Sequence, residues 1–318
     1  MASSSVRSRA GFFLGVSDMA KRKAKELDLP TLIERFGGEG KCHAYLEELR
    51  WPDGLACPRC KGAVISRLAK RRQFECDSCA YQFSVRVGTV LQDSKLPLWK
   101  WFLAVYMMCQ SRKGLSANQL KRMVGVSYKT AWFLCHRIRA AMGGGINAPL
   151  SGIVEVDEPY VGGKVRGHGR GYRGNKSMVL GAIERGGEVR LRLETHADRK
   201  TLHDFILRVT EDETQAIFTD ERPAYASIAD ADTRHETVNH RAEEWVRGEV
   251  HTNTVESVWS LLKRSIIGSY HHLSVKHLPA YLDELEWRFN KRGSEYLFRD
   301  TVIALCRSEV VTYEKLIG

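Results

Sequence analysis

Three acidic residues of the chain stand where carboxylates could act together on metal ions. Asp157 follows the β-branched run IVEV, Asp220 follows the short apolar run AIFT, and Glu256 begins the helical pattern of HTNTVESVWSLLKR. Acids at strand ends open into the cleft beside a sheet edge, where ligands bind. Two strand-borne aspartates and one helix-borne glutamate predict a site for two Mg²⁺ ions, which would activate an attacking oxygen and stabilise the leaving oxygen of a phosphodiester.

Neighbouring acids compete for the same site, and with 38 acids in the chain the three carboxylates are a weak signal alone. Glu158 and Glu221 directly follow the two aspartates, so they point to the other face of the sheet if the strand geometry persists. Glu155 shares the face of Asp157 but lies further into the sheet. We therefore expect these three residues to be rivals rather than the main ligands.

Helical periodicity divides the segment from 251 to 264 into two faces. One face is polar and carries Asn253, Glu256, Ser260 and Lys263. The other face is apolar and should dock on the sheet through Val255, Val258, Trp259 and Leu262. The polar face would deliver Glu256 to the metal ions. Lys263 and Arg264 would bind DNA phosphate beside the cleft.

Two CxxC pairs, Cys57/Cys60 and Cys76/Cys79, have fifteen residues between them. This spacing is typical of a four-cysteine zinc site, in which each turn supplies two thiolates to one tetrahedral Zn²⁺. Two accidental pairs or a redox dithiol are the alternatives, but a redox CxxC needs no second copy. Because all four positions are filled by protein, the zinc would be structural. The other cysteines lie in helical patterns and indicate buried thiols in a reducing cytosol.

The segment from 115 to 139 is typical of a helix-turn-helix. Ser116 and Ser127 can cap two helices, and Gly125 suits the turn between them. Leu120, Met123, Val124 and Val126 would pack the pair, and Trp132, Phe133 and Ile138 would hold the second helix. Tyr128 and Lys129 would then face the major groove, while His136, Arg137 and Arg139 could reach phosphates. An ordinary helical hairpin is the alternative.

The composition agrees with a polyanionic partner. The 318 residues carry 49 Lys+Arg against 38 Asp+Glu, a net charge of +11 and a pI near 9.3, which favours nucleic acid. No apolar run approaches the ~18 residues that span a membrane, so we expect no membrane contact and a cytoplasmic, nucleoid-associated protein. Arg173 lies in a Gly- and Arg-rich loop suited to backbone contacts with DNA.

Changes in composition and periodicity suggest the elements that position these residues. We expect a disordered tail at 1–29, a helical lead-in and Cys-rich β segment at 30–92, helices and a Gly linker at 93–146, and an α/β domain at 147–318. The α/β domain should contain strands at GIVEVDEPYVG, SMVLGAIER, EVRLRLET and QAIFTDE, a helix at TLHDFILRVT, and a long helical C-terminal region.

The whole pattern resembles the ISXO-type DDE transposases of prokaryotic insertion sequences, which carry an N-terminal zinc ribbon. The resemblance rests on AYLEELRWPDGLACPRC, CDSCAYQFSVRVGTVLQDSKLPLWKWF, IVEVDEPYVGGK, IFTDERPAY, HTNTVESVWSLLKRSIIGSYHHLS and YLDELEWRFN. It implies a ribonuclease H-like catalytic domain with its first acid on the first strand (Asp157), its second on the fourth (Asp220) and its third on a C-terminal helix (Glu256). In this family the third acid is sometimes replaced by Asn, so Asn253 is an alternative ligand.

The resemblance also implies an activity. The ribbon and paired helices would bind terminal inverted repeats, and the acids with two Mg²⁺ would cleave the element's ends and join them to target DNA. Bringing two ends together implies a homodimer or a larger assembly on double-stranded DNA. The alternatives are a DNA-binding regulator with an inactive catalytic domain and a metal-dependent nuclease that hydrolyses without strand transfer.

Overall fold

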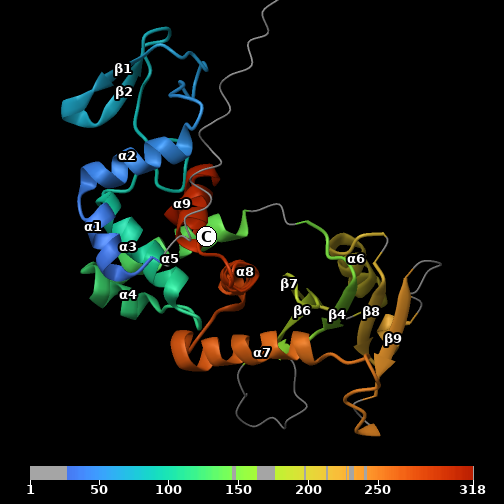
Figure 1. The fold of residues 1–318 in the computed structure, drawn as a ribbon. Helices are drawn as coiled ribbons and strands as arrows, with labels where there is room; N and C mark the ends of the chain where they lie inside the picture. The colour runs from blue at the N-terminus through green and yellow to red at the C-terminus, as the bar shows by residue number, and fades with distance from the viewer. Residues whose placement is uncertain are drawn as a thin grey trace, which may run out of the picture.

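A computed structural model of the chain describes residues 27–144, 148–162, 176–196, 198–212, 214–226, 228, 233–239 and 242–317. The described residues form three parts: a helical body, a small β ribbon and a larger mixed sheet flanked by helices (Figure 1). The predicted disordered tail lies almost entirely outside the described ranges. No helix in the described ranges is both long and apolar enough to cross a membrane.

The helical body is built from segments that are far apart in the chain. It contains α1 (Leu29–Phe36), α2 (Glu39–Arg50), α3 (Leu98–Gln110), α4 (Ala117–Val124), α5 (Tyr128–Gly143) and α9 (Leu297–Arg307). The apolar run of α3 fills the centre of this body with Trp101, Phe102 and Met108. From α9 at the other end of the chain, Val302 and Leu305 pack into the same core. The body is therefore closed by the last part of the sequence.

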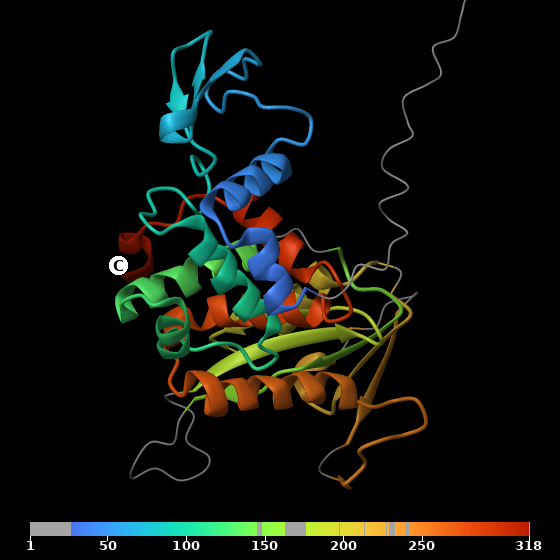
Figure 2. The same cartoon turned by 60° about the vertical axis from the view of Figure 1, so that its left-hand side comes forward.

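The ribbon is a three-stranded antiparallel sheet, β1 (Ile65–Leu68), β2 (Gln73–Cys76) and β3 (Gln82–Phe83). It has its own small core around Phe74 and Phe83. An exposed ion pair between Arg67 and Glu47 links it to α2. In both views the ribbon stands at the end of the helical body that is remote from the larger sheet (Figures 1 and 2).

The larger sheet has the order β7-β6-β4-β8-β9, with the short β5 (Tyr160–Val161) also pairing with β6. Its main strands are β4 (Ile153–Asp157), β6 (Ser177–Glu184), β7 (Val189–Glu194), β8 (Ala216–Asp220) and β9 (Arg234–Val238). β6 runs antiparallel to its neighbours β4 and β7, whereas β4, β8 and β9 are parallel. This is the ribonuclease H-like arrangement that the resemblance implies, although the sequence reading did not include β9.

Helices cover both faces of this sheet. α6 (Arg199–Val209) packs on one face, where Phe205 and Ile206 meet Val156 and Leu180. α7 (Asn253–Ser265) and α8 (Leu278–Asn290) pack on the other. Figure 2 shows α7 lying lengthwise along the sheet. Alternation along β4 therefore sends Val154 and Val156 toward α6 and the side chains between and after them toward α7.

α7 docks through the apolar face that its periodicity predicts. Val255, Val258, Trp259 and Leu262 are all at most 3% exposed. Each aliphatic side chain buried in this way contributes about 1.5–3 kcal/mol to stability. A π-helical turn (Ile266–Tyr270) and a 3-10 turn (Val275–His277) connect α7 to α8, and the described chain ends with α10 (Tyr313–Ile317).

The cores do not follow the boundaries that the sequence predicts. α1 and α2, predicted to lead into the ribbon, share a core with α3, α4 and α5. α9, predicted to belong to the catalytic domain, packs in that same core. α8 joins the two larger parts, because its Glu284 forms a buried ion pair with Arg139 of α5.

Candidate active site and metal centre

The two predicted aspartates lie together. Asp157 ends β4 and Asp220 ends β8, and these parallel strands are neighbours with Glu155 opposite Phe218. Continuing that register by two residues brings Asp157 level with Asp220. Carboxylate oxygens of Asp157, Asp220 and Glu158 all lie within 4.8 Å of one another. We call these three residues the acidic group.

The carboxylate of Asp157 is held on two sides. Its Oδ1 accepts a hydrogen bond from the backbone N–H of Glu158 at 2.8 Å. Its Oδ2 accepts one from the indole N–H of Trp259 on α7 at 2.9 Å. Asp220 Oδ1 accepts a hydrogen bond from the backbone N–H of Arg222 at 3.1 Å. Both aspartates are partly buried at the edge of the sheet.

Glu158 reaches the acidic group because β4 ends at Asp157, so the strand alternation that would turn its side chain away does not continue. Its side chain is only 4% exposed. One carboxylate oxygen pairs with the guanidinium of Arg222 and the other accepts the hydroxyl of Tyr225. Burial, followed by the charges of Asp157 and Asp220, holds the pKa of Tyr225 well above its usual value, so its hydroxyl remains a donor.

Glu155 has a different role from that of the rival metal ligand considered in the sequence analysis. It shares the face of Asp157, as expected, but is fully buried beneath the start of α7. Its carboxylate accepts hydrogen bonds from the backbone N–H groups of Thr254 and Val255 at 2.8 and 3.1 Å, and pairs with Arg185 at 2.7 Å. It therefore satisfies helix N–H groups that the helix itself leaves unpaired. This contact fixes where α7 begins relative to β4.

The polar face of α7 is exposed at its start and near its end. Glu256 lies in the first turn, three residues before Trp259, and Asn253 is the first helical residue. Glu256 is outside the acidic group, as is Glu221. Lys263 and Arg264 are exposed in the last turn of the helix.

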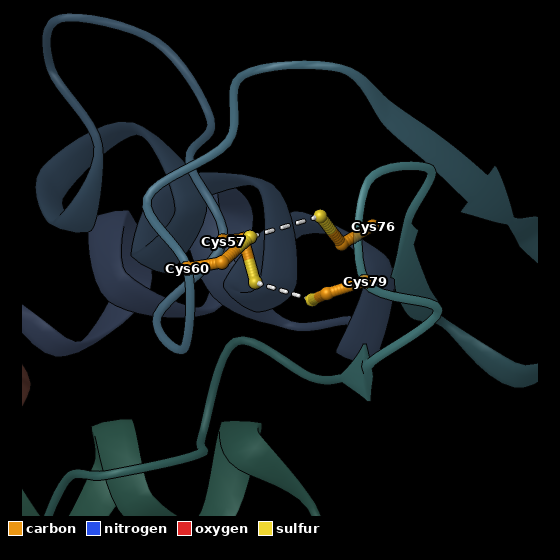
Figure 3. A group of neighbouring side chains, drawn as sticks. All are labelled: Cys57, Cys60, Cys76 and Cys79. Carbon is orange, nitrogen blue, oxygen red and sulfur yellow. Dashed lines mark hydrogen bonds between the residues drawn. The ribbon is translucent and has the colours of Figure 1, made fainter.

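The four predicted zinc ligands converge. The sulfurs of Cys57, Cys60, Cys76 and Cys79 lie within 4.8 Å of one another and face one another across two turns (Figure 3). The Cys57–Cys79 and Cys60–Cys76 sulfur distances are 3.8 and 3.4 Å. A tetrahedral Zn²⁺ with Zn–S bonds of 2.3 Å separates its sulfurs by about 3.8 Å. The four thiols therefore fit one structural zinc ion.

Both zinc turns have the same backbone. Lys61 and Ala80, the residues after the second cysteine of each pair, have φ of 63° and 52°. Their N–H groups bond the carbonyls of Cys57 and Cys76 at 2.9 and 2.8 Å. Burial acts to raise the pKa of the Cys57 thiol, but hydrogen bonds from backbone N–H groups lower it below its usual value. At Cys79 a backbone N–H lowers the pKa of the thiol, whereas the neighbouring sulfurs raise it above its usual value.

The four remaining cysteines are consistent with structural thiols. Cys42, Cys135 and Cys306 are buried and Cys109 is partly buried. Burial raises the pKa of each thiol, to about 11 for Cys135 and Cys306 and about 12 for Cys42 and Cys109.

The helix-turn-helix has the predicted caps and turn. The hydroxyls of Ser116 and Ser127 accept hydrogen bonds from backbone N–H groups three residues later, at 3.2 and 3.1 Å. Gly125 ends α4 with φ of 66°, a left-handed conformation that glycine adopts without strain. Tyr128 and Lys129 are exposed in the first turn of α5, and the Lys129 ammonium lies 4.5 Å from the ring of Tyr313.

Three basic residues of α5 contradict the expectation that they reach DNA phosphates. Arg137 and Arg139 are only 3% and 1% exposed, and His136 is 1% exposed. Arg139 forms its 2.7 Å ion pair with Glu284, and Arg137 donates to the carbonyl of Gln92 at 2.6 Å. The prediction was wrong because the second half of α5 is the centre of the helical body.

One packing prediction in the same region was also wrong. Met123 of α4 is 48% exposed, whereas Leu120 and Val124 are buried as expected. Arg173, with the rest of its Gly- and Arg-rich loop, lies outside the described residues.

Trp259 and Gly181 belong to the site, although the sequence predicted a role there for neither residue. Trp259 appeared only as an apolar docking residue, and Gly181 only as part of a strand. Gly181 is paired directly with Asp157 across β4 and β6. A glycine inside an otherwise apolar strand often marks a close approach, and this was the available signal.

The chain joins a four-cysteine ribbon, through a helical body, to a ribonuclease H-like domain with paired aspartates. This combination is the one expected of a DDE transposase with a zinc ribbon. Comparison with known families agrees: the model for the ISXO2-like transposase domain matches residues 149–290, and that for a transposase zinc-ribbon domain matches residues 37–82. A protein from Halobacterium salinarum, described as an uncharacterized protein in transposable element ISH50, is 32% identical over 290 residues. The alignment covers 83% of this chain and 96% of that relative. The chain belongs to the ISXO2-like transposase family.

Two solved structures resemble the chain only weakly. A chain of the simian T-cell lymphotropic virus intasome in complex with PP2A regulatory subunit B56 gamma matches with a TM-score of 0.30 and 15% identity, over 58% of this chain and 66% of that one. The Mos1 transposase paired-end complex with left transposon end matches with a TM-score of 0.27 and 11% identity, over 65% and 79%. Similarity at this level carries no argument about the site.

Proposed function

We propose that the protein is a transposase that binds the terminal inverted repeats of its insertion sequence and catalyses Mg²⁺-dependent cleavage and strand transfer. The observation that carries this proposal is the meeting of Asp157 and Asp220 at one sheet edge, in a chain of this family. Two Mg²⁺ ions at such a site supply an activated attacking oxygen and a stabilised leaving oxygen. Asp157 and Asp220 would hold and orient those ions.

Glu256 is proposed as the third metal ligand. Glu158 is nearer, but its oxygens are engaged by Arg222 and Tyr225 inside the protein. Glu256 is exposed on the helix that contacts Asp157 through Trp259, one turn away. A carboxylate also holds Mg²⁺ better than the amide of Asn253 does. Glu158 would then support the site from inside the protein, through its contacts with Arg222 and Tyr225.

DNA contacts are proposed for residues at four places along the chain. The ribbon presents exposed cations on its turns and on a short 3-10 helix: Arg59, Lys61, Lys70, Arg71 and Arg72. α5 presents Tyr128 and Lys129 at its start, where a recognition helix contacts bases. Lys263 and Arg264 would bind phosphate along the cleft, and Arg173 would do so from its loop. Holding two element ends together would require at least a dimer on DNA.

The proposal is tested with purified protein, a labelled element end, target DNA and Mg²⁺. We expect joined products with the wild type and none with Asp157→Asn, which should bind the end as well as the wild type does. Binding without cleavage would support a DNA-binding regulator instead. Hydrolysis without joining would support a nuclease.

The third ligand is tested by comparing Glu256→Gln with Glu158→Gln. Loss of Mg²⁺-dependent cleavage in Glu256→Gln with retained thermal stability supports the assignment. Glu158→Gln should instead lower the melting temperature, because it weakens a buried ion pair. If only Glu158→Gln loses cleavage while remaining stably folded, the third ligand is Glu158.

A further inference from the structure

Trp259 makes a polar contact from within an apolar core. The side chain is 3% exposed and belongs to the cluster between the sheet and α7. Its indole N–H nevertheless donates to Asp157 Oδ2 at 2.9 Å. A buried indole needs a partner for its N–H. Here that partner is the carboxylate at the end of β4.

The sheet has a space made for this indole. Gly181 of β6 pairs with Asp157, and a Cβ built on it would lie 2.3 Å from Cη2 and 2.5 Å from Cζ2 of Trp259. Such distances cannot be accommodated without moving the ring or the strand. The φ of Gly181 is not positive, so its backbone conformation does not require glycine. The glycine is needed for the room it leaves.

The position of α7 is fixed at a second point. Glu155, two residues before Asp157 on the same strand, accepts the N–H groups of Thr254 and Val255 at the start of the helix. Trp259 follows one turn later. Two carboxylates on one face of β4 therefore bind α7 at two points, and Glu256 lies between them in the sequence of the helix.

We propose that Trp259 is a positioning residue for the metal site: its indole N–H orients the carboxylate of Asp157, and Gly181 provides the space that this requires. The inference rests on the proposed function, because it assumes that Asp157 holds a divalent cation. A carboxylate has about four lone-pair sites. The backbone N–H of Glu158 engages a site on Oδ1 and the indole N–H of Trp259 engages a site on Oδ2, so the two donors together orient the group.

Trp259→Phe tests this inference because it keeps an aromatic ring and removes the N–H. The readout is the Mg²⁺ concentration at the midpoint of thermal stabilisation, measured on the zinc-loaded protein, with the Mg²⁺ dependence of DNA cleavage as a second readout. Losing a group that orients a metal ligand typically weakens metal binding about 10–100-fold. We expect both midpoints to rise by about that factor.

Trp287→Phe is the matched control. The indole N–H of Trp287 donates to Thr301 at 3.0 Å, away from the acidic group. The same chemical change there should leave the Mg²⁺ midpoint at the wild-type value. If Trp259→Phe also keeps the wild-type midpoint, or if the wild type is not stabilised by Mg²⁺, the inference is overturned.

Gly181→Ala gives an independent variant in which the indole N–H is present but the ring is displaced. We expect it to raise the Mg²⁺ midpoint as Trp259→Phe does. In the double variant the added methyl group should have little further effect, because the smaller ring leaves room for it; additive effects would contradict the inference. A wild type that binds Mg²⁺ in this assay but cleaves no DNA overturns the proposed function, while the midpoints still decide the role of Trp259.

Discussion

The zinc ribbon and the acidic group are both clusters of metal-ligand side chains, but they are assembled over very different lengths of chain. The ribbon's cysteines come from two tight turns with fifteen residues between them. The acidic group joins the ends of β4 and β8, with 62 residues between its two aspartates. The ribbon depends on local turn geometry and would depend on a bound zinc ion, whereas the acidic group depends on a sheet that other interactions stabilise.

Removing zinc should have the largest effect and should be confined to the ribbon. Zinc binding supplies the folding free energy of small zinc domains, on the order of 10 kcal/mol in isolated peptides. We expect a strong chelator to abolish amide protection in β1, β2 and β3 while β4 and β6 remain protected, as measured by hydrogen exchange. Equal loss of protection in both sheets would show that the ribbon supports the whole protein.

Asp220→Asn should have the opposite pattern. The change removes a charge that attracts divalent cations but keeps the size of the side chain, so we expect cleavage and joining to be abolished. Zinc content, measured by atomic absorption, should remain at one ion per chain. Cys76→Ser is the reciprocal variant and should lose zinc. If Asp220→Asn still joins DNA ends, the acidic group is not the active site.

Tyr225→Phe should have a smaller effect within the acidic group. It removes the hydroxyl donated to Glu158 and leaves one oxygen of a buried carboxylate short of a partner, which costs about 1–3 kcal/mol. We expect a lower melting temperature and reduced cleavage. Tyr296→Phe, at a tyrosine that is 37% exposed, is the control and should melt as the wild type does. An unchanged melting temperature in Tyr225→Phe would argue against this contact.

Lys129→Ala should have the smallest effect. It extends the comparison to α5, which begins with a local capping motif and has its second half buried in the helical body. Removing one phosphate-binding ammonium should weaken DNA binding and reduce the slope of log affinity against log salt by about 1. Arg139→Met should leave that slope unchanged and lower stability, because it removes the nearer of the two guanidinium groups that pair with the buried Glu284, at 2.7 Å, and leaves Arg288 at 3.3 Å. Salt titration of binding and thermal melting separate the two.

Local patterns were sufficient for much of the fold. The caps Ser116 and Ser127, the four cysteines, the strands that end at Asp157 and Asp220, and the apolar face of α7 could all be predicted, because each depends on neighbours within a few residues. The packing of α9 against α3 and the presence of β9 could not. α9 has an amphipathic pattern that fits several partners, and the RHETV segment of β9 is polar because its edge of the sheet is less buried.

The site shows the same division among its glutamates. Sequence alternation correctly placed Glu155 on the face of Asp157, but it did not indicate that this carboxylate would bind the start of α7. The same alternation predicted that the side chain of Glu158 points to the other face of the sheet, because it requires the strand to continue past Asp157. The burial of Arg137 and Arg139 was not predicted either, since basic residues on a helix have the same sequence pattern whether they face solvent or a buried partner such as Glu284.

The sequence by itself determined the zinc ligands, the helix caps, the strand-end aspartates and the family, because turn geometry and side-chain periodicity act over short separations. Tertiary structure alone decided which carboxylate meets which partner: that Glu158 faces Arg222 and Tyr225, that Glu155 anchors α7, and that Trp259 passes over Gly181 to reach Asp157. Those choices depend on how a strand and a helix about a hundred residues apart are placed against each other. Packing of the whole sheet sets that placement.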